Sequence, residues 1–265
     1  MTERKAGKLG MKNFRRNDVK LKFRTYLNTA ALPNVPARFG HVSNTPPGGY
    51  ATWGMLGNDK YGCCVLAGAA HEQMLWQAAT HRNIPEFTAQ NIVGQYLRLT
   101  DGEDNGLDPV TVANYRRTVG ISDSNGTNYR IKAYALVDSL HELEYAVYLF
   151  GAVGIGFFLP PSAQPQFMAH HMWDDVGHSP DPNAGHYVPI VGRMGGHWVA
   201  ITWGELQGIT DDYMQKYSFD AGGGGIAYFS RSYLLDSGKS PEAIDEAALD
   251  EDLKAIPGIS DVESA

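Results

Sequence analysis

The sequence is poor in cysteine, and the two cysteines that it has, Cys63 and Cys64, are adjacent. Neighbouring cysteines rarely reach the geometry of a disulfide, and there is no third cysteine to pair with either of them. Disulfides therefore do not hold this fold together, which is typical of a protein that works in a reducing compartment.

Long hydrophobic runs are also lacking. A membrane-spanning helix needs roughly 20 consecutive apolar residues, and the nearest candidate, residues 146–161, is interrupted by glycines. Residues 1–22 are polar and basic, without the apolar core of a secretory signal peptide. The sequence thus predicts a cytoplasmic protein that has no membrane partner.

The sequence is rich in glycine and has enough apolar residues for a core. Its 265 residues are 43% hydrophobic and 11% aromatic, and they include 30 glycines. This composition favours one large globular domain, or two small ones, with many turns and a mixed core rather than a helical bundle.

The net charge of −7 conceals opposite charges at the two ends of the chain. We expect a basic extended arm over residues 1–25, a folded domain over 26–235 and an acidic C-terminal tail over 236–265, because neither end shows apolar periodicity. Both ends are expected to lie outside the folded core. The arm can bind an anionic partner, pair with a neighbouring subunit, or remain a solvated tail.

The strongest chemical signal lies in residues 57–71. A polar turn between glycines leads through Cys63 and Cys64 into small and apolar residues with helical spacing. A thiol at the start of a helix lies near unpaired backbone N–H groups and the positive end of the helix dipole, which favour the thiolate. Cys64 is therefore the candidate nucleophile, and the alternative is a small buried side chain of the core.

This segment resembles the nucleophile segment of papain-like cysteine peptidases, in which a Gln lies six positions before the Cys that opens the central helix. Asn58 lies six positions before Cys64. The resemblance implies that the Asn58 side chain and the Cys64 backbone N–H form an oxyanion hole. It also places Cys63 on the preceding turn, as the less suitable nucleophile.

Helices and strands alternate in the rest of the chain. Apolar spacing and capping residues predict helices over 64–80, 88–99, 107–119 and 139–150, and strands over 129–137 and 153–159. Residues 160–184 are rich in proline and histidine and predict a long loop that lines the cleft. Neither this loop nor the acidic loop 101–106 has the spacing of a known zinc or calcium site, so we predict no metal and no cofactor.

A second segment supplies the candidate base. His186 opens an alternating strand, and after a hairpin turn a second strand ends in Trp203-Gly204. The pattern is similar to the His segment of papain-like peptidases, and it lies about 120 residues after Cys64. The resemblance implies that the sheet places His186 opposite the Cys64 helix as general base, and His197 at the hairpin tip is the alternative.

The third catalytic position departs from the family. Papain-like peptidases have an Asn two residues before that Trp, whereas this chain has Ile201 there, which cannot accept a hydrogen bond. Thr202 is the candidate in its place, because a hydroxyl can accept one. Successive strand side chains point in opposite directions, however, so Thr202 would have to face the other way from Ile201.

The resemblance covers roughly residues 30–235 and implies an α+β, papain-like fold. A helical half with the central Cys-bearing helix would pack against an antiparallel sheet half. The implied function is a thiol hydrolase, a peptidase or amidase that acts on a peptide or protein substrate through Cys64 and His186. The alternative is a catalytically weak or inactive structural or accessory protein, since chains of this appearance also resemble proteins of phage and prophage genomes, including components of the phage virion.

Overall fold

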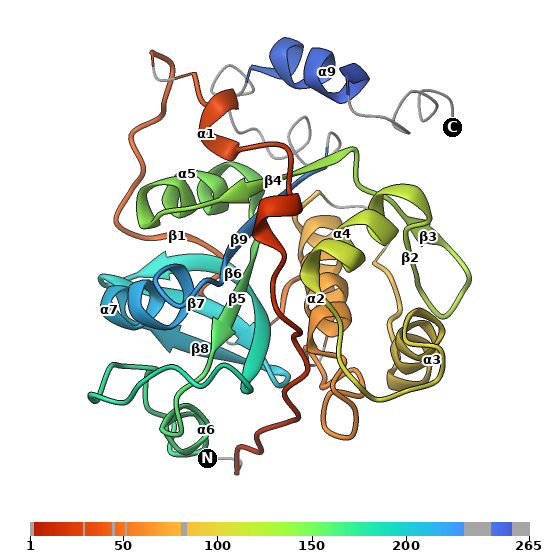
Figure 1. Cartoon of the computed structure of the whole chain (residues 1–265), viewed down its shortest axis with the longest axis vertical. Coiled ribbons are helices and arrows are strands. Elements are labelled where there is room, and N and C mark those ends of the chain that lie inside the picture. The colour runs from red at the N-terminus through yellow and green to blue at the C-terminus, as the bar shows by residue number, and fades with distance from the viewer. Residues whose placement is uncertain are drawn as a thin grey trace.

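Helices and strands gather into two groups that lie side by side in the computed structural model (Figure 1). The structure describes residues 3–28, 30–43, 46–50, 52–80, 84–230 and 245–255. The longer helices are α2 (Cys64–Ala79), α3 (Ala89–Leu99), α4 (Pro109–Thr118), α5 (Leu140–Phe150), α6 (Ala163–Met168) and α9 (Glu246–Ala255). Shorter helical segments are η1 (Arg16–Asp18), α1 (Phe23–Tyr26), η2 (Pro47–Gly49), α7 (Asp211–Met214) and the π-helical turn η3 (Gln215–Phe219).

The strands are β1 (Phe39–Gly40), β2 (Ile121–Ser122), β3 (Asn128–Tyr129), β4 (Ala133–Val137), β5 (Val153–Phe158), β6 (Gly185–Met194), β7 (His197–Thr202), β8 (Glu205–Ile209) and β9 (Gly224–Phe229). A seven-stranded antiparallel sheet has the order β4-β9-β5-β6-β7-β8, with β1 also paired to β6, and β2 pairs with β3. With α2 packed against β6, the fold is α+β, and a helical half meets an antiparallel sheet half as the sequence predicts. No helix in the described ranges is long and apolar enough to cross a membrane.

Side-chain caps explain where the predicted helices begin. The Thr88 hydroxyl accepts a hydrogen bond from the Asn91 N–H, and Ser139 does the same for Glu142 N–H. The Asp108 carboxylate caps α4, whose first residue is Pro109, a position where proline's missing N–H costs nothing. These helices therefore start within two residues of the predicted positions.

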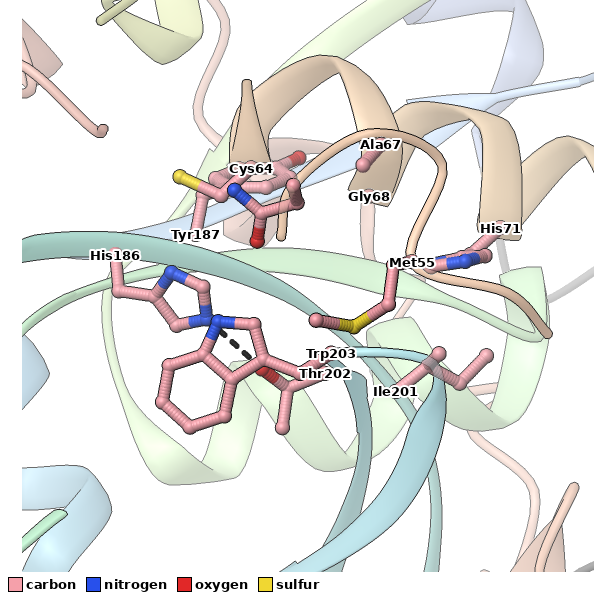
Figure 2. Close-up of a pocket in the computed structure, with 11 residues that line it drawn as sticks. Met55, Cys64, Ala67, Gly68, His71, His186, Tyr187, Ile201, Thr202 and Trp203 are labelled. Carbon is pink, nitrogen blue, oxygen red and sulfur yellow. Dashed lines mark hydrogen bonds between the residues drawn. The ribbon is translucent and has the colours of Figure 1, made fainter. Parts of the chain in front are cut away.

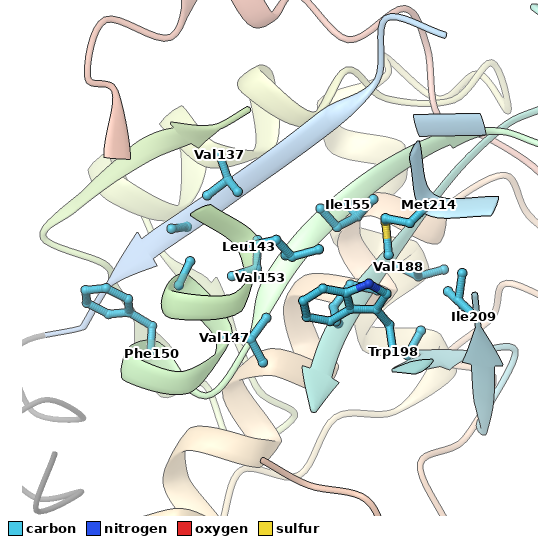
Figure 3. Packing of buried hydrophobic residues seen from close by; sticks show 14 of the residues in the cluster. Val137, Leu143, Val147, Phe150, Val153, Ile155, Val188, Trp198, Ile209 and Met214 are labelled. Carbon is cyan, nitrogen blue, oxygen red and sulfur yellow. The ribbon is translucent and has the colours of Figure 1, made fainter. Parts of the chain in front are cut away.

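The largest hydrophobic cluster lies between the sheet and the helices α5 and α7 (Figure 3). Side chains from both helices and from several strands contribute to it, including Val137, Leu143, Val147, Phe150, Val153, Ile155, Val188, Trp198, Ile209 and Met214. Burial of this much apolar surface gives the strands β5 and β6 a rigid support.

The helix α2 approaches the strand β6 closely because glycines lie at the contact. A Cβ atom on Gly68 would lie 2.9 Å from Cδ1 of Tyr187 and 3.3 Å from Cδ of Pro189. The Tyr187 ring cannot retreat, since a Cβ on Gly154 of β5 would lie 1.5 Å from its hydroxyl oxygen. Tyr187 is thus held between two glycines, directly after His186.

A buried ion pair fastens α2 to α4. The Glu72 carboxylate accepts a hydrogen bond from the Arg116 guanidinium, and neither side chain is exposed to solvent. The Tyr187 hydroxyl donates to Glu72 at 3.4 Å and lies 2.8 Å from the Tyr228 hydroxyl. Breaking such a pair from one side leaves a buried charge uncompensated, so α2, α4 and β6 are held together as one unit.

Residues 3–26 pack along the domain, and the expectation of an arm outside the core is wrong. The segment is largely extended and runs between the helical half and the sheet half (Figure 1). Phe14, Val19, Leu21, Phe23 and Tyr26 are all buried in the core clusters. The apolar residues are too irregularly spaced to show periodicity, which is why the sequence reading missed them.

The basic side chains of this segment contact acidic residues of the same chain. The pairs are Arg4–Glu205, Lys8–Asp104, Arg15–Asp108, Arg16–Asp138 and Arg24–Asp138. An external anionic partner or a neighbouring subunit for the arm stays a prediction.

Part of the acidic tail also packs on the core. Leu249 of α9 is buried in the main cluster, and the Tyr26 hydroxyl donates to the Asp252 carboxylate at 2.8 Å. The expectation of a tail outside the core is therefore wrong for residues 245–255, while 231–244 and 256–265 lie outside the described residues. The predicted loop 160–184 likewise contains a helix, α6.

Substitution of Gly68 tests the close contact between α2 and β6. We expect Gly68→Ala to lower the free energy of unfolding by roughly 1–3 kcal/mol, because the added methyl group meets a ring that cannot move away. Gly94→Ala in α3 is the matched control. Its Cβ would lie 3.8 Å from the nearest other atom, so the better helix propensity of alanine should stabilise the protein by up to about 1 kcal/mol. Urea unfolding of both variants measures the difference, and an equal gain in both would contradict the proposed contact.

Candidate active site

Cys64 is the first residue of α2 and lies where the helix meets the sheet. Backbone N–H groups of Tyr187, Gly10, Val65 and Cys64 itself lie around its sulfur and act to lower its pKa. Two of these belong to the helix N-terminus, whose unpaired donors the sequence analysis anticipated. The other two come from β6 and from the N-terminal segment.

The four residues that the sequence analysis selected line one pocket. Asn58, Cys64, His186 and Thr202 surround a cavity of about 10 Å³, close to the volume that one water needs. In Figure 2 the Cys64 sulfur and the His186 imidazole lie on the same side of this pocket. His197, the alternative base, lies at the far end of β6 and β7 and is not part of the lining.

Thr202, and not Ile201, contacts the histidine. Nε2 of His186 lies 2.8 Å from the Thr202 hydroxyl, while Nδ1 has no hydrogen-bond partner among the described residues. Trp203 stacks on the imidazole, with ring centroids 4.8 Å apart and planes 26° from parallel. The stacked indole shields the hydrogen bond from water and fixes the plane of the ring.

A β-bulge explains why Thr202 faces His186. Near the hairpin Met194 pairs with His197, but the register shifts between Ile190 and Gly192, so that Ile190 pairs with Ala200. Directly paired residues point to the same face, and the side-chain period of a strand is two. The shift of one residue therefore moves Thr202 to the face of His186, and Ile201 to the opposite face.

The adjacent cysteines have different surroundings. The Cys63 thiol is fully buried and lies 3.8 Å from the Leu56 carbonyl oxygen, to which it donates. Burial raises the pKa of Cys63 well above its usual range. Only Cys64 lines the pocket, so only Cys64 can face a substrate there.

Burial in the closed site favours a neutral thiol and a neutral imidazole over the thiolate that the helix N-terminus predicts. Burial raises the pKa of Cys64 to about 11, although the backbone N–H groups around the sulfur act in the opposite direction. Burial lowers the pKa of His186 to about 3. Desolvation thus outweighs the helix dipole while the site is closed.

The N-terminal segment closes the site. The Lys8 N–H donates to the Asn58 carbonyl at 2.7 Å, and the Asn58 side-chain amide donates to the Lys8 carbonyl at 3.0 Å. The N–H groups of Gly10 and Met11 donate to the Gly185 carbonyl at 3.1 and 2.9 Å. The proposed oxyanion amide is therefore occupied by the chain's own backbone.

Arg4 anchors the beginning of this segment on the sheet side of the pocket. Its guanidinium donates to the Glu205 carboxylate at 2.6 Å, to the Leu206 carbonyl at 2.8 Å and to the Gln207 side chain at 3.1 Å. It also lies over the Phe167 ring, 4.7 Å from the centroid. The segment is thus held on both sides of Cys64, which is 2% exposed.

His71 contributes to the site in a way that the sequence analysis missed. Its Nε2 lies 3.1 Å from the carbonyl oxygens of both Trp53 and Gly54, so it fixes the loop that leads to Asn58. His71 follows Cys64 by seven residues, which places both on the same face of α2. That spacing was the available signal. Burial lowers the pKa of His71 to about 4.

The two buried histidines should make the protein sensitive to mild acid. Both are neutral when folded, with pKa values below the usual value of about 6.5, so below that pH the unfolded chain binds protons that the folded chain does not. The contribution of these two histidines to the free energy of unfolding is fully present above pH 6.5. It falls as the pH drops towards 4, by up to about 1.4 kcal/mol per pH unit for each histidine.

Urea unfolding at pH 7, 6 and 5 tests this expectation. His71→Gln keeps an amide donor for the two carbonyls and should reduce the slope, whereas His141→Gln, at an exposed position of α5, should leave it unchanged. If the free energy of unfolding changes with pH by the same slope in the unmodified protein and in both variants, His71 does not contribute to the acid sensitivity.

No family model and no curated protein matches this sequence. Solved structures do match. Xylellain, a cysteine protease from Xylella fastidiosa, has a TM-score of 0.61 at 10% identity, over 87% of this chain and 98% of that chain. Procathepsin L 3 of Tenebrio molitor matches with a TM-score of 0.54 at 12% identity, over 82% of this chain and 76% of that chain. Procathepsin B S9 from Trypanosoma congolense matches with a TM-score of 0.54 at 12% identity, over 84% of this chain and 86% of that chain. The chain therefore has the papain-like fold of cysteine peptidases.

Proposed function

We propose that the protein is a thiol hydrolase, a peptidase or amidase, with Cys64 as nucleophile and His186 as general base. The observation that carries the proposal is the single pocket that Asn58, Cys64, His186 and Thr202 line, at the start of the central helix of a papain-like fold. A likeness at 10–12% identity shows the fold, so the activity rests on this geometry.

The contacts of the imidazole support one assignment of its protons. Nδ1 has no partner among the described residues and is free to take the proton of the Cys64 thiol. The neutral ring then carries its proton on Nε2 and donates it to the Thr202 hydroxyl. Thr202 accepts the bond that an Asn carbonyl accepts in the family, one residue further along the strand.

The reaction follows from these roles. The sulfur attacks the substrate carbonyl carbon, and the oxyanion is stabilised by the Asn58 side-chain amide and the Cys64 backbone N–H. The imidazolium gives its proton to the leaving nitrogen, which departs as an amine and leaves a thioester. A water molecule, deprotonated by His186, then releases the acid and restores the thiol.

The alternative is a catalytically weak or inactive structural or accessory protein. The observation that favours it is the closed site, in which Cys64 is 2% exposed and its pKa is raised. The two functions differ in what happens when the N-terminal segment is released. In a hydrolase, water and substrate then reach Cys64, and the ion pair with His186 can form.

Release of the segment is tested with Arg4→Ala. Loss of the contacts to Glu205, Leu206 and Gln207 should increase the rate of Cys64 alkylation by iodoacetamide at pH 7 by roughly tenfold. Arg15→Ala is the control, since Arg15 pairs with Asp108 and Asp18 beyond the pocket. Mass spectrometry of peptides separates Cys64 from Cys63.

The same variants then test hydrolysis. Arg4→Ala should release peptides from unfolded casein, and Cys64→Ser in the same background should not. Rapid alkylation without any hydrolysis would favour the structural alternative, and slow alkylation in both arginine variants would contradict the closure by the segment.

Thr202→Val tests the orienting hydrogen bond. Valine keeps the shape of threonine but cannot accept the Nε2 proton, so we expect kcat in the Arg4→Ala background to fall on the order of tenfold. Ile201→Val is the matched control and should change kcat little, because it leaves the Thr202 hydroxyl in place. Equal losses in the two variants would indicate a packing effect and not a role in orienting His186.

A further inference from the structure

Lys8 makes contacts with its side chain as well as with its backbone. Its ammonium group lies 3.1 Å from Oδ2 of Asp104, while its carbonyl oxygen accepts from the Asn58 amide at 3.0 Å. One residue of the N-terminal segment 4–10, the closing segment, therefore contacts both the Asn58 amide proposed for the oxyanion hole and the Asp104 carboxylate.

The Asp104 carboxylate is fixed in place. Its Oδ1 accepts from the Gly62 N–H at 2.8 Å and from the Tyr96 hydroxyl at 2.9 Å, which leaves Oδ2 for Lys8. Partial burial opposes ionisation, but the hydrogen bonds from Gly62, Lys8 and Tyr96 outweigh it and lower the pKa of Asp104. The group is ionised at neutral pH, and its Oδ2 faces the Lys8 ammonium.

Asp104 also lies close to the nucleophile. Gly62, which it holds, is two residues before Cys64, and Asp104 lines a second cavity of about 300 Å³. The lining also includes Lys8, Gly10 and Met11 of the N-terminal segment, and Gly185 at the start of β6. Release of the segment would take the Lys8 ammonium away from the Asp104 carboxylate.

We propose that Asp104 selects substrates with a lysine or arginine side chain beside the scissile bond, and that Lys8 holds this position in the closed chain. The proposal rests on the proposed function of Cys64 and adds the substrate class. A substrate carbonyl that replaces the Lys8 carbonyl on Asn58 brings an adjacent basic side chain within reach of the same carboxylate.

The charge around the cavity favours a cation over other side chains. Asp101 and Glu103 lie on the same loop and add negative charge, and the Lys12 ammonium contacts the Asn105 side chain instead of Asp104. An acidic substrate side chain would meet an ionised carboxylate, and an apolar one would leave it unpaired.

The experiment uses the full chain with the substitutions Arg4→Ala and Lys8→Ala. They remove the ammonium group that pairs with Asp104 and leave Met11 and the core residues unchanged. The probes are two chloromethyl ketones, acyl-lysine and acyl-norleucine, which differ only in the terminal charged group. In each case the Cys64 sulfur displaces chloride from the methylene carbon to form a thioether, and peptide mass spectrometry measures the rate of labelling at Cys64. We expect the lysine probe to label at least about tenfold faster.

Asp104→Asn should remove this preference, because its amide oxygen can still accept from Gly62 and Tyr96 while the charge is lost. Glu103→Gln, an exposed neighbour, is the matched control and should keep the preference. Equal labelling by both probes in the Arg4→Ala, Lys8→Ala protein overturns the proposal. So does a preference for the lysine probe that survives Asp104→Asn.

The two proposals fail in different ways. Hydrolysis of casein with no preference between the probes leaves the hydrolase standing and removes the role of Asp104. A strong lysine preference in labelling without any hydrolysis keeps Asp104 as a recognition residue and removes the hydrolase. If Asp104→Asn slows both probes equally, its role is to hold the Gly62 turn, and the selection of basic side chains is wrong.

Discussion

The close approach of α2 to β6 is the constraint on which the site depends. Cys64 begins the helix and His186 lies near the start of the strand, so the distance between the two elements decides whether a thiol and an imidazole can share a pocket. Gly68 allows that approach, and Tyr187 fills the remaining space. The residue that packs the interface directly follows the residue proposed to do the chemistry.

The same tight packing explains why burial favours neutral groups in the closed site. Every atom that excludes water from Cys64 and His186 makes their charged forms less stable, and burial outweighs the N-terminal dipole of α2. Residues 4–11 complete this exclusion. Under the proposed function, release of these residues would admit water to both groups at once, and the position of the segment would then control the protonation of the pair as well as access to it.

The sequence predicted the parts of the structure that local rules determine. Capping residues and apolar spacing marked the helices that start at Cys64, Ala89, Pro109 and Leu140, because caps and periodicity act within a few residues of the chain. The path of residues 3–26 could not be read in this way. Its order comes from contacts such as Arg4 with Glu205, 201 residues away, and composition alone made it look like a free basic arm.

The third residue of the site shows how a one-residue shift in pairing can preserve a contact while changing its position in the sequence. If the register at the hairpin continued along β6, His186 would share its face with Ile201, and the imidazole would meet a side chain without an acceptor. The bulge between Ile190 and Gly192 exchanges the faces and brings Thr202 to Nε2 at 2.8 Å. Counting two positions back from Trp203 in the sequence leads to Ile201, and suggests that the hydrogen-bond acceptor for His186 is lost. The register of the strands shows that an acceptor is present, one residue further along, and that the bulge is what places it there.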